Sequence, residues 1–143
     1  MTLSLSKFKM SNIVFNNLDT KGPVIVMIGR RDTGKSVLVR DLLFFHQDIP
    51  IGTVISGTES GNGFYSDLVP KLFIHDNYNS SIVDKILTRQ KMVVKQIGRD
   101  KRANKKNVTD PRTFVILDDC LYDDKWTRDV LMRQLFMNGE CLP

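Results

Sequence analysis

The sequence is poor in the residues that build disulfide frameworks, metal clusters and membrane anchors. Its two cysteines, Cys120 and Cys141, cannot form a metal cluster, so we expect reduced thiols. Its two histidines, His46 and His75, have no carboxylate or cysteine at ligand spacing, which favours surface or hydrogen-bonded roles. No apolar run approaches the roughly 20 residues that cross a bilayer, and the first residues lack the pattern of a secretory signal. We therefore expect one intracellular domain over residues 1–143, without membrane insertion.

The positive charge is modest overall but unevenly distributed. The net charge is +5, and a short polar stretch, residues 98–110, holds a disproportionate share of the cations. Lysines and arginines gathered on one surface are sufficient for contact with DNA phosphates, although a solvated connection has the same composition. Both interpretations stay open for this stretch. Its basic residues are Arg99, Lys101, Arg102, Lys105 and Lys106.

A phosphate-binding motif dominates the N-terminal half. Residues 29–36 fit G-x-x-x-x-G-K-[ST], and an apolar run over residues 24–28 leads directly into them. The pattern needs glycines for a tight loop, consecutive N–H groups aimed at phosphates, a lysine for the β- and γ-phosphates, and a hydroxyl for Mg²⁺. A glycine-rich turn with an incidental lysine is the alternative, and the strand-loop-helix context argues against it. The predicted nucleotide-binding residues are Gly29, Arg30, Arg31, Asp32, Thr33, Gly34, Lys35, Ser36 and Val37.

Alternating strand and helix patterns predict an α/β fold with three layers and a mainly parallel sheet. The unbroken apolar run at residues 24–28 is typical of a central parallel strand. The residues that follow the loop, 37–45, have apolar side chains at helical spacing. We further predict strands at 13–15, 52–56, 71–74 and 113–117, helical turns at 64–69, and helices at 82–97 and 125–137.

A second chemical element is the apolar run 113–117 followed by Asp118 and Asp119, which has the form of a Walker B strand. The C-terminal end of a buried parallel strand lies beside the phosphate loop in open α/β sheets. Asp118 is therefore predicted to bind Mg²⁺ together with Ser36, and Asp119 to polarise the attacking water. A second acid at this position favours ATP hydrolysis over phosphate transfer to a metabolite. Lys35 and Asp119 are thus the predicted catalytic residues.

The combined motifs resemble the genome-packaging ATPase of nucleocytoplasmic large DNA viruses, a family of FtsK/HerA-type P-loop motors. The resemblance rests on the segments 29–36, 56–59, 62–65, 70–74, 89–90, 117–120 and 136–139. It implies a RecA-like P-loop fold and an oligomeric, ring-forming motor that uses ATP and Mg²⁺ to move double-stranded DNA into a capsid. It also implies contact with capsid or virion components, and a location in the host cytoplasm, at the viral factory, or in the virion.

The resemblance also implies that the chain is shorter than similar proteins at its C-terminal side. Those proteins continue past residue 139 into a further strand that carries a polar sensor residue. That strand lies between the phosphate-loop strand and the Walker B strand, so we expect a gap in the middle of this sheet. Unpaired buried backbone groups cost about 1–3 kcal/mol each, which makes the stability of the isolated chain doubtful.

Three functional hypotheses follow from these observations. The first is a DNA-translocating ATPase, the second a P-loop kinase for a small metabolite, and the third a shortened chain that binds nucleotide without turnover. Arg89 and Arg99 are candidate arginine fingers acting on a neighbouring subunit. Glu59 either faces the nucleotide or is a solvated loop acid.

Overall fold

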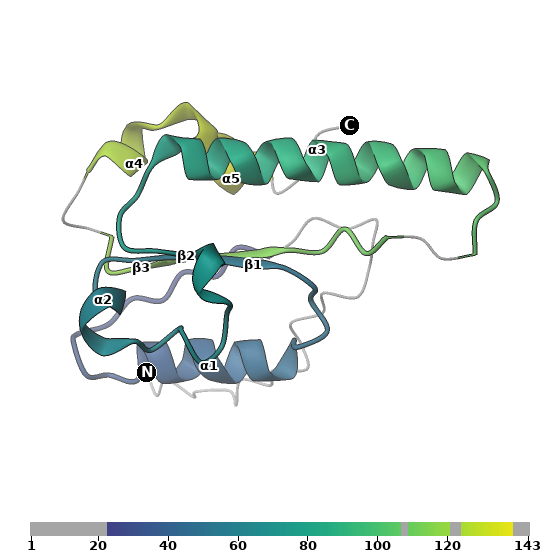
Figure 1. Ribbon diagram of the computed structural model, residues 1–143. Helices are drawn as coiled ribbons and strands as arrows, with labels where there is room; N and C mark the ends of the chain where they lie inside the picture. The colour runs from purple at the N-terminus through teal and green to yellow at the C-terminus, as the bar shows by residue number, and fades with distance from the viewer. Residues whose placement is uncertain (1–22, 107–108, 121–123, 139–143) are drawn as a thin grey trace, which may run out of the picture.

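The computed structural model describes residues 23–106, 109–120 and 124–138, which form a three-layer α/β arrangement (Figure 1). Its sheet has three parallel strands in the order β2-β1-β3, where β1 is Gly52–Ser56, β2 is Ile74–His75 and β3 is Phe114–Asp118. β1 is the central strand and pairs with β3 along its full length, from Gly52 opposite Phe114 to Ser56 opposite Asp118.

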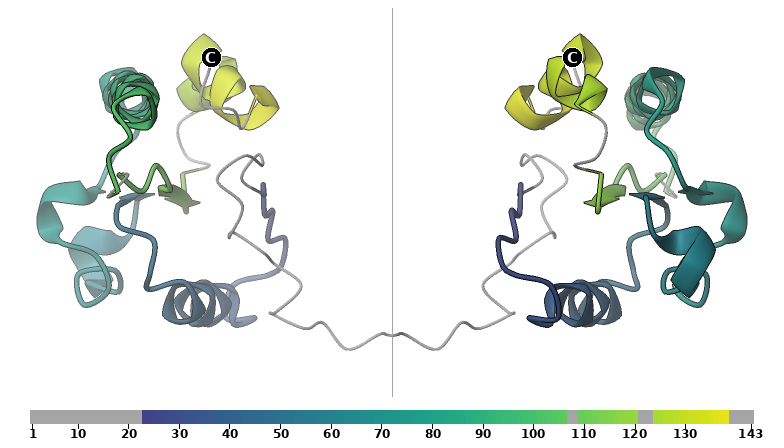
Figure 2. Two further views of the ribbon diagram at one scale, coloured as in Figure 1. Left: turned by 90° about the vertical axis from the view of Figure 1, so that its right-hand side faces the viewer. Right: turned by 90° about the vertical axis from the view of Figure 1, so that its left-hand side faces the viewer.

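Helices cover both faces of this sheet. The helix α1, Lys35–Phe45, and the short α2, Glu59–Asn62, lie on one face. The long α3, Ser80–Arg102, lies on the other (Figures 1 and 2). Two further helices, α4 at Lys125–Arg128 and α5 at Val130–Asn138, share the side of α3, and α5 packs against α3. None of the helices in the described ranges is both long and apolar enough to cross a bilayer.

The core on the α1 side forms because alternate strand residues point to the same face of a sheet. Val54 of β1 is fully buried there with Tyr65 and Val69, and Phe114 and Ile116 of β3 pack against them. The same alternation places the side chain of Asp118 on this face. Helix α1 and the carboxylate that ends β3 therefore share one side of the sheet.

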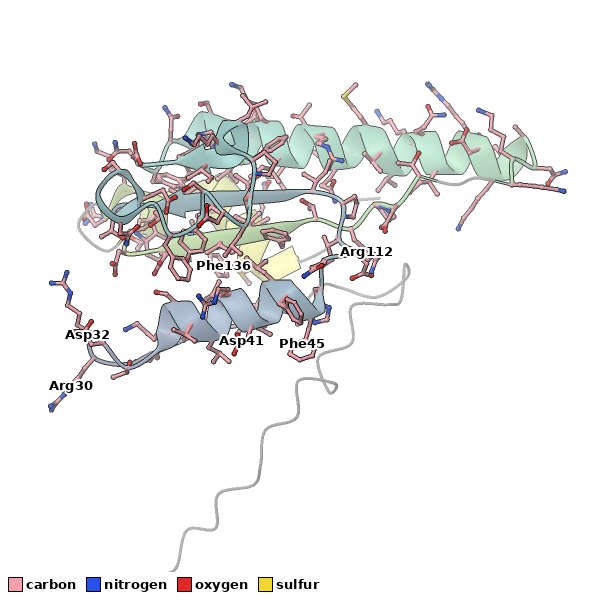
Figure 3. The ribbon with its side chains drawn as sticks, turned by 60° about the horizontal axis from the view of Figure 1, so that its bottom comes forward. Arg30, Asp32, Asp41, Phe45, Arg112 and Phe136 are labelled. Atoms are coloured by element: carbon pink, nitrogen blue, oxygen red, sulfur yellow. The ribbon has the colours of Figure 1, made fainter. Side chains whose placement is uncertain are left out.

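Arg112 ties the start of β3 to the segment that follows α1. Its guanidinium lies 2.6 Å from carboxylate oxygens of both Asp48 and Asp110 (Figure 3). These hydrogen bonds lower the pKa values of both aspartates. The contact therefore holds the C-terminal end of α1 close to the start of β3. The loop at 29–36 lies at the other end of this helix.

The strongest sequence patterns gave the correct elements. The α/β class, the parallel pairing, the helix after the loop, the strand at 52–56 and the strand entering Asp118 are all confirmed. The long amphipathic helix is also confirmed, and Asn79 caps it by accepting a hydrogen bond from the Ser81 N–H at 2.9 Å. The predicted strand at 13–15 lies outside the described residues.

The predicted turn at residues 64–69 is present, because the N–H groups of Leu68 and Val69 both donate to the Tyr65 carbonyl at 2.9 Å. Three other local predictions were wrong in their bounds. The strand predicted at 71–74 is only the two-residue β2, and Lys71–Phe73 form a 3₁₀ turn before it. The helix predicted at 125–137 is divided by Asp129, whose ψ of 126° is extended. Residues 98–102, predicted to be loop, complete the last turn of α3, because nothing before Ala103 interrupts its hydrogen bonding.

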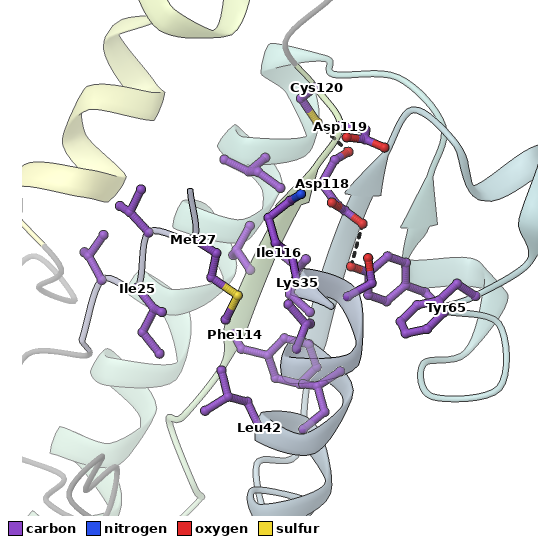
Figure 4. Close-up of a pocket in the computed structure, with 18 of the residues that line it drawn as sticks. Ile25, Met27, Lys35, Leu42, Tyr65, Phe114, Ile116, Asp118, Asp119 and Cys120 are labelled. Carbon is purple, nitrogen blue, oxygen red and sulfur yellow. Dashed lines mark hydrogen bonds between the residues drawn. The ribbon is translucent and has the colours of Figure 1, made fainter. Parts of the chain in front are cut away.

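The prediction of a central strand at residues 24–28 was also wrong, since within the described ranges this segment pairs with no strand. These residues have no regular secondary structure, and Val24, Val26 and Ile28 are exposed. They lie beside β3 without pairing with it, and both segments line one cavity of about 2190 Å³ (Figure 4). We call the part of this cavity between residues 24–28 and β3 the apolar groove; the loop at 29–36 and the two acids at the end of β3 line another part of the same cavity. The groove lies where the sequence predicted a gap in the sheet.

Candidate nucleotide site

The loop over residues 29–36 leads directly into α1, as the motif requires. Lys35 is the first residue of the helix, and its ammonium donates to the main-chain oxygens of Gly29 at 3.0 Å and Arg30 at 2.7 Å. The Thr33 hydroxyl also donates to the Arg30 carbonyl, at 2.8 Å. The lysine therefore holds the loop closed from the inside, while the Arg30 and Asp32 side chains point outward (Figure 3).

Two glycines are needed where the motif places them. Gly34 has a φ of 82°, in the left-handed region that favours glycine. A Cβ atom on Gly29 would lie 2.8 Å from the Thr33 hydroxyl oxygen, so a larger residue would disturb the tight loop. These positions fit a backbone that wraps closely around a phosphate group.

The N-terminus of α1 is open to an anion. Gly34 is the N-cap residue, and its carbonyl accepts a backbone hydrogen bond from the Leu38 N–H. No side chain caps the helix. The first turn also holds no acidic residue. The N–H groups of Lys35, Ser36 and Val37 belong to the set that a helix leaves without an internal partner. Together with the helix dipole, they favour a bound phosphate.

Asp118 lines the same pocket as the loop, from the end of β3 (Figure 4). Its Oδ2 atom accepts a hydrogen bond from the Tyr65 hydroxyl at 2.8 Å. Its backbone carbonyl accepts from the Gly57 N–H at 3.2 Å, which joins the end of β3 to the turn after β1. Both the backbone and the side chain of this aspartate are thus held by neighbouring elements.

Asp119 has a different environment from Asp118. It is exposed, lines the pocket, and has a φ of 50°, which L-residues other than asparagine and aspartate rarely adopt. This conformation turns the chain sharply after β3. The two adjacent carboxylates therefore differ in environment: that of Asp118 is held by a hydrogen bond, and that of Asp119 is open to solvent.

Sequence reasoning missed the role of Glu59 and Tyr65. Glu59 is neither a nucleotide-facing nor a solvated acid, because only 7% of its surface is exposed. Its carboxylate accepts hydrogen bonds from the backbone N–H groups of Tyr65, at 3.0 Å, and Ser66, at 2.9 Å. Tyr65 is 1% exposed, and burial together with the Asp118 contact raises the pKa of its phenol. The phenol therefore stays a donor at neutral pH.

The remaining candidates divide into structural and solvent-facing residues. Cys120 is a free, buried cysteine whose thiol pKa is raised by burial, and the thiol donates to the Ile55 carbonyl at 3.3 Å. Trp126 donates to the Cys120 carbonyl at 3.1 Å. Arg89 donates to the Gln90 side chain at 3.0 Å, whereas Arg99 is exposed in the last turn of α3.

The basic residues near the end of α3 are all exposed. Arg99, Lys101 and Arg102 occupy its last turn, and Lys105 and Lys106 follow it. Lys105 lies 3.0 Å from the Asp100 carboxylate, so its charge is already paired. We call Lys101, Arg102 and Lys106 the basic patch.

The described residues contain no group of three or more histidine, cysteine or acidic side chains that would hold a metal ion alone. Mg²⁺ at phosphate sites commonly uses one or two protein ligands, with substrate oxygens and water completing its octahedron. Ser36 on α1 and Asp118 on β3 line one pocket and supply a hydroxyl and a carboxylate. The donor set therefore fits Mg²⁺ bound together with a nucleotide.

The proteins to which the chain is similar come from large DNA viruses. It is 44% identical to an uncharacterized protein of Invertebrate iridescent virus 6 over 119 residues, covering 82% of this chain and 42% of that protein. It is 35% identical to an uncharacterized protein of Acanthamoeba polyphaga mimivirus over 138 residues, which are 96% of this chain and 48% of that protein.

A third relative, an uncharacterized protein of Frog virus 3, is 35% identical over 140 residues, which are 94% of this chain and 41% of that protein. The chain thus spans less than half the length of these curated relatives. No family model and no solved structure matches the chain.

Proposed function

We propose that this chain binds ATP with Mg²⁺ and forms the nucleotide-binding part of a P-loop motor that moves double-stranded DNA during virus assembly. The observation that carries the proposal is one pocket lined by the loop lysine, the open first turn of α1 and the two acids after β3. Lys35 and the first-turn N–H groups would hold the phosphates, and Ser36 and Asp118 the metal. Bound Mg²⁺ neutralises charge on the phosphate oxygens.

The wider parts of the proposal rest on the resemblance and on the viral relatives. In a ring of subunits, Arg89 or Arg99 would reach the site of a neighbour, and capsid or virion components would be partners. The work would take place in the host cytoplasm, at the site of virus assembly, or in the virion. The relatives are longer than this chain, so these properties are proposed for the whole protein.

Nucleotide binding without turnover is the second candidate. It is favoured by the segment 24–28, because the loop at 29–36 then follows a segment that is not part of the sheet and is not fixed by it. ATP binding combined with no phosphate release, with or without DNA, would support this candidate. DNA-stimulated phosphate release would support the motor, and phosphate transfer to a metabolite would support a kinase.

Lys35→Ala is expected to weaken ATP binding about 10- to 100-fold, because a hydrogen bond to a charged group is worth about 1.5–3 kcal/mol. Titration with a fluorescent ATP analogue measures the change. Arg40→Ala is the matched control, since Arg40 is an exposed cation on the same helix outside the loop. Equal affinities of the Lys35→Ala variant and the parent chain would refute the nucleotide site.

Replacing the basic patch by glutamine is expected to weaken DNA binding equally for all sequences. The slope of log K against log salt should become shallower by about 0.9 for each phosphate that the variant no longer neutralises. Fluorescence anisotropy with duplex DNA at several salt concentrations measures the slope. The control removes the same charge from the exposed residues Arg40, Lys71 and Lys85. If both triple variants have the parent slope, the patch is a solvated surface.

A further inference from the structure

A buried tyrosine joins two elements of the proposed site that are far apart in the sequence. The Tyr65 phenol donates to Asp118 Oδ2 across 53 residues of chain, at 2.8 Å. The ring is buried in the core with Val54 and Val69, and it meets Phe64 edge to face with ring centroids 5.0 Å apart. Packing therefore restricts the position of the hydroxyl.

The backbone of Tyr65 is held as firmly as its side chain. The buried Glu59 carboxylate accepts two charge-assisted hydrogen bonds, from the N–H groups of Tyr65 and Ser66. Glu59 opens α2, in the turn that follows β1, and the Gly57 N–H in the same turn donates to the Asp118 carbonyl. A closed set of contacts thus connects the end of β1, the phenol and the end of β3.

This contact determines which oxygen of Asp118 is available to a ligand. Oδ2 is engaged by the phenol, which leaves Oδ1 for the pocket that Lys35 and Ser36 also line (Figure 4). Hydrogen bonds to a metal-binding carboxylate commonly fix its orientation and affect metal affinity. We propose that Tyr65 is a positioning residue that orients Asp118 for Mg²⁺ bound with the nucleotide. The proposal rests on the proposed nucleotide site.

Tyr65→Phe tests the proposal, because it removes the hydroxyl and keeps the buried ring. With Mg²⁺ present, the affinity for a fluorescent ATP analogue is expected to fall about tenfold, the lower end of what removal of such a partner costs. With EDTA in place of Mg²⁺, the affinity is expected to equal that of the parent chain. The readout is the ratio of the two dissociation constants, which a general loss of stability would not change.

Tyr78→Phe is a closely matched control. The Tyr78 hydroxyl also donates to an aspartate, Asp129, which lies outside the proposed site. Both substitutions remove one tyrosine–aspartate hydrogen bond, and thermal unfolding should report a loss of stability for each. Only the Tyr65 variant should have a smaller ratio of affinities with and without Mg²⁺. In an Asp118→Ala background, Tyr65→Phe should have no further effect on the ratio, because its action passes through that carboxylate.

Glu59→Gln keeps the proposal testable if Tyr65→Phe does not fold. It retains the phenol but weakens the contacts that hold its backbone, so the ratio should change in the same direction by a smaller factor. If the parent binds ATP with Mg²⁺ dependence and the Tyr65 and Glu59 variants keep the parent ratio, the positioning role is wrong. If the parent binds no ATP, and Lys35→Ala behaves identically, the nucleotide site itself is wrong.

Discussion

Asp119→Asn is expected to retain Mg²⁺-dependent ATP binding and to slow ATP hydrolysis by about 10²- to 10⁴-fold, the usual contribution of a general base. Asp119 is exposed and lines the pocket, whereas the hydrogen bonds to Tyr65 and Gly57 that hold the end of β3 are made by Asp118. Asparagine tolerates the left-handed backbone at this position as well as aspartate does, so the turn should be preserved. The substitution therefore removes the carboxylate that we propose as the general base and leaves the backbone of the turn unchanged.

Asp118→Asn is the matched comparison and should behave differently. An amide oxygen can still accept from the Tyr65 hydroxyl, but the negative charge that favours Mg²⁺ is removed. ATP binding should then need a higher Mg²⁺ concentration, which titration of this chain measures. Turnover is measured in a chimera of the Invertebrate iridescent virus 6 protein in which the 119 aligned residues are replaced by the matching residues of this chain. Identical behaviour of the two variants would contradict the division of roles.

The local motifs could be predicted from the sequence because their chemistry is encoded in neighbouring residues. The loop motif has Gly29, Gly34 and Lys35 at fixed spacing; in the structure Gly34 has a positive φ, and Lys35 begins α1 and donates to the Gly29 carbonyl. β3 was predicted from its β-branched and aromatic residues. Because Asp118 is the last residue of that strand, the prediction of the strand also gave the position of this aspartate at its C-terminal end. Such features depend on the backbone conformation of a few consecutive residues.

The Tyr65 contact could not be predicted in the same way, because it is created by the packing of two segments that lie 53 residues apart in the chain. Nothing within several residues of Tyr65 indicates that it meets Asp118, and the Glu59 carboxylate finds its partners only when the chain turns back. The strand predicted at residues 24–28 failed for a related reason. Apolar composition indicates a buried strand, but a strand also needs a neighbour to accept its hydrogen bonds.

The isolated chain is expected to associate with itself through the apolar groove as its concentration rises. Phe114 donates to the Ile51 carbonyl, and Asp118 accepts from Gly57, so the even-numbered residues of β3 direct their backbone groups toward β1. Because backbone direction alternates along a strand, Val115 presents its N–H and C=O on the free edge, inside the groove. An unpaired edge flanked by apolar side chains is a template for pairing with another chain.

Val26→Lys is expected to weaken this association about 10- to 100-fold, the effect of no longer burying one aliphatic side chain. Val26 lines the groove and is 71% exposed, so the lysine should not disturb a packed core. Met92→Lys is the control, because Met92 is 66% exposed on α3, outside the groove. Sedimentation velocity over a range of concentrations measures both variants. A parent chain that stays monomeric throughout, or equal effects of the two lysines, would show that the groove does not drive association.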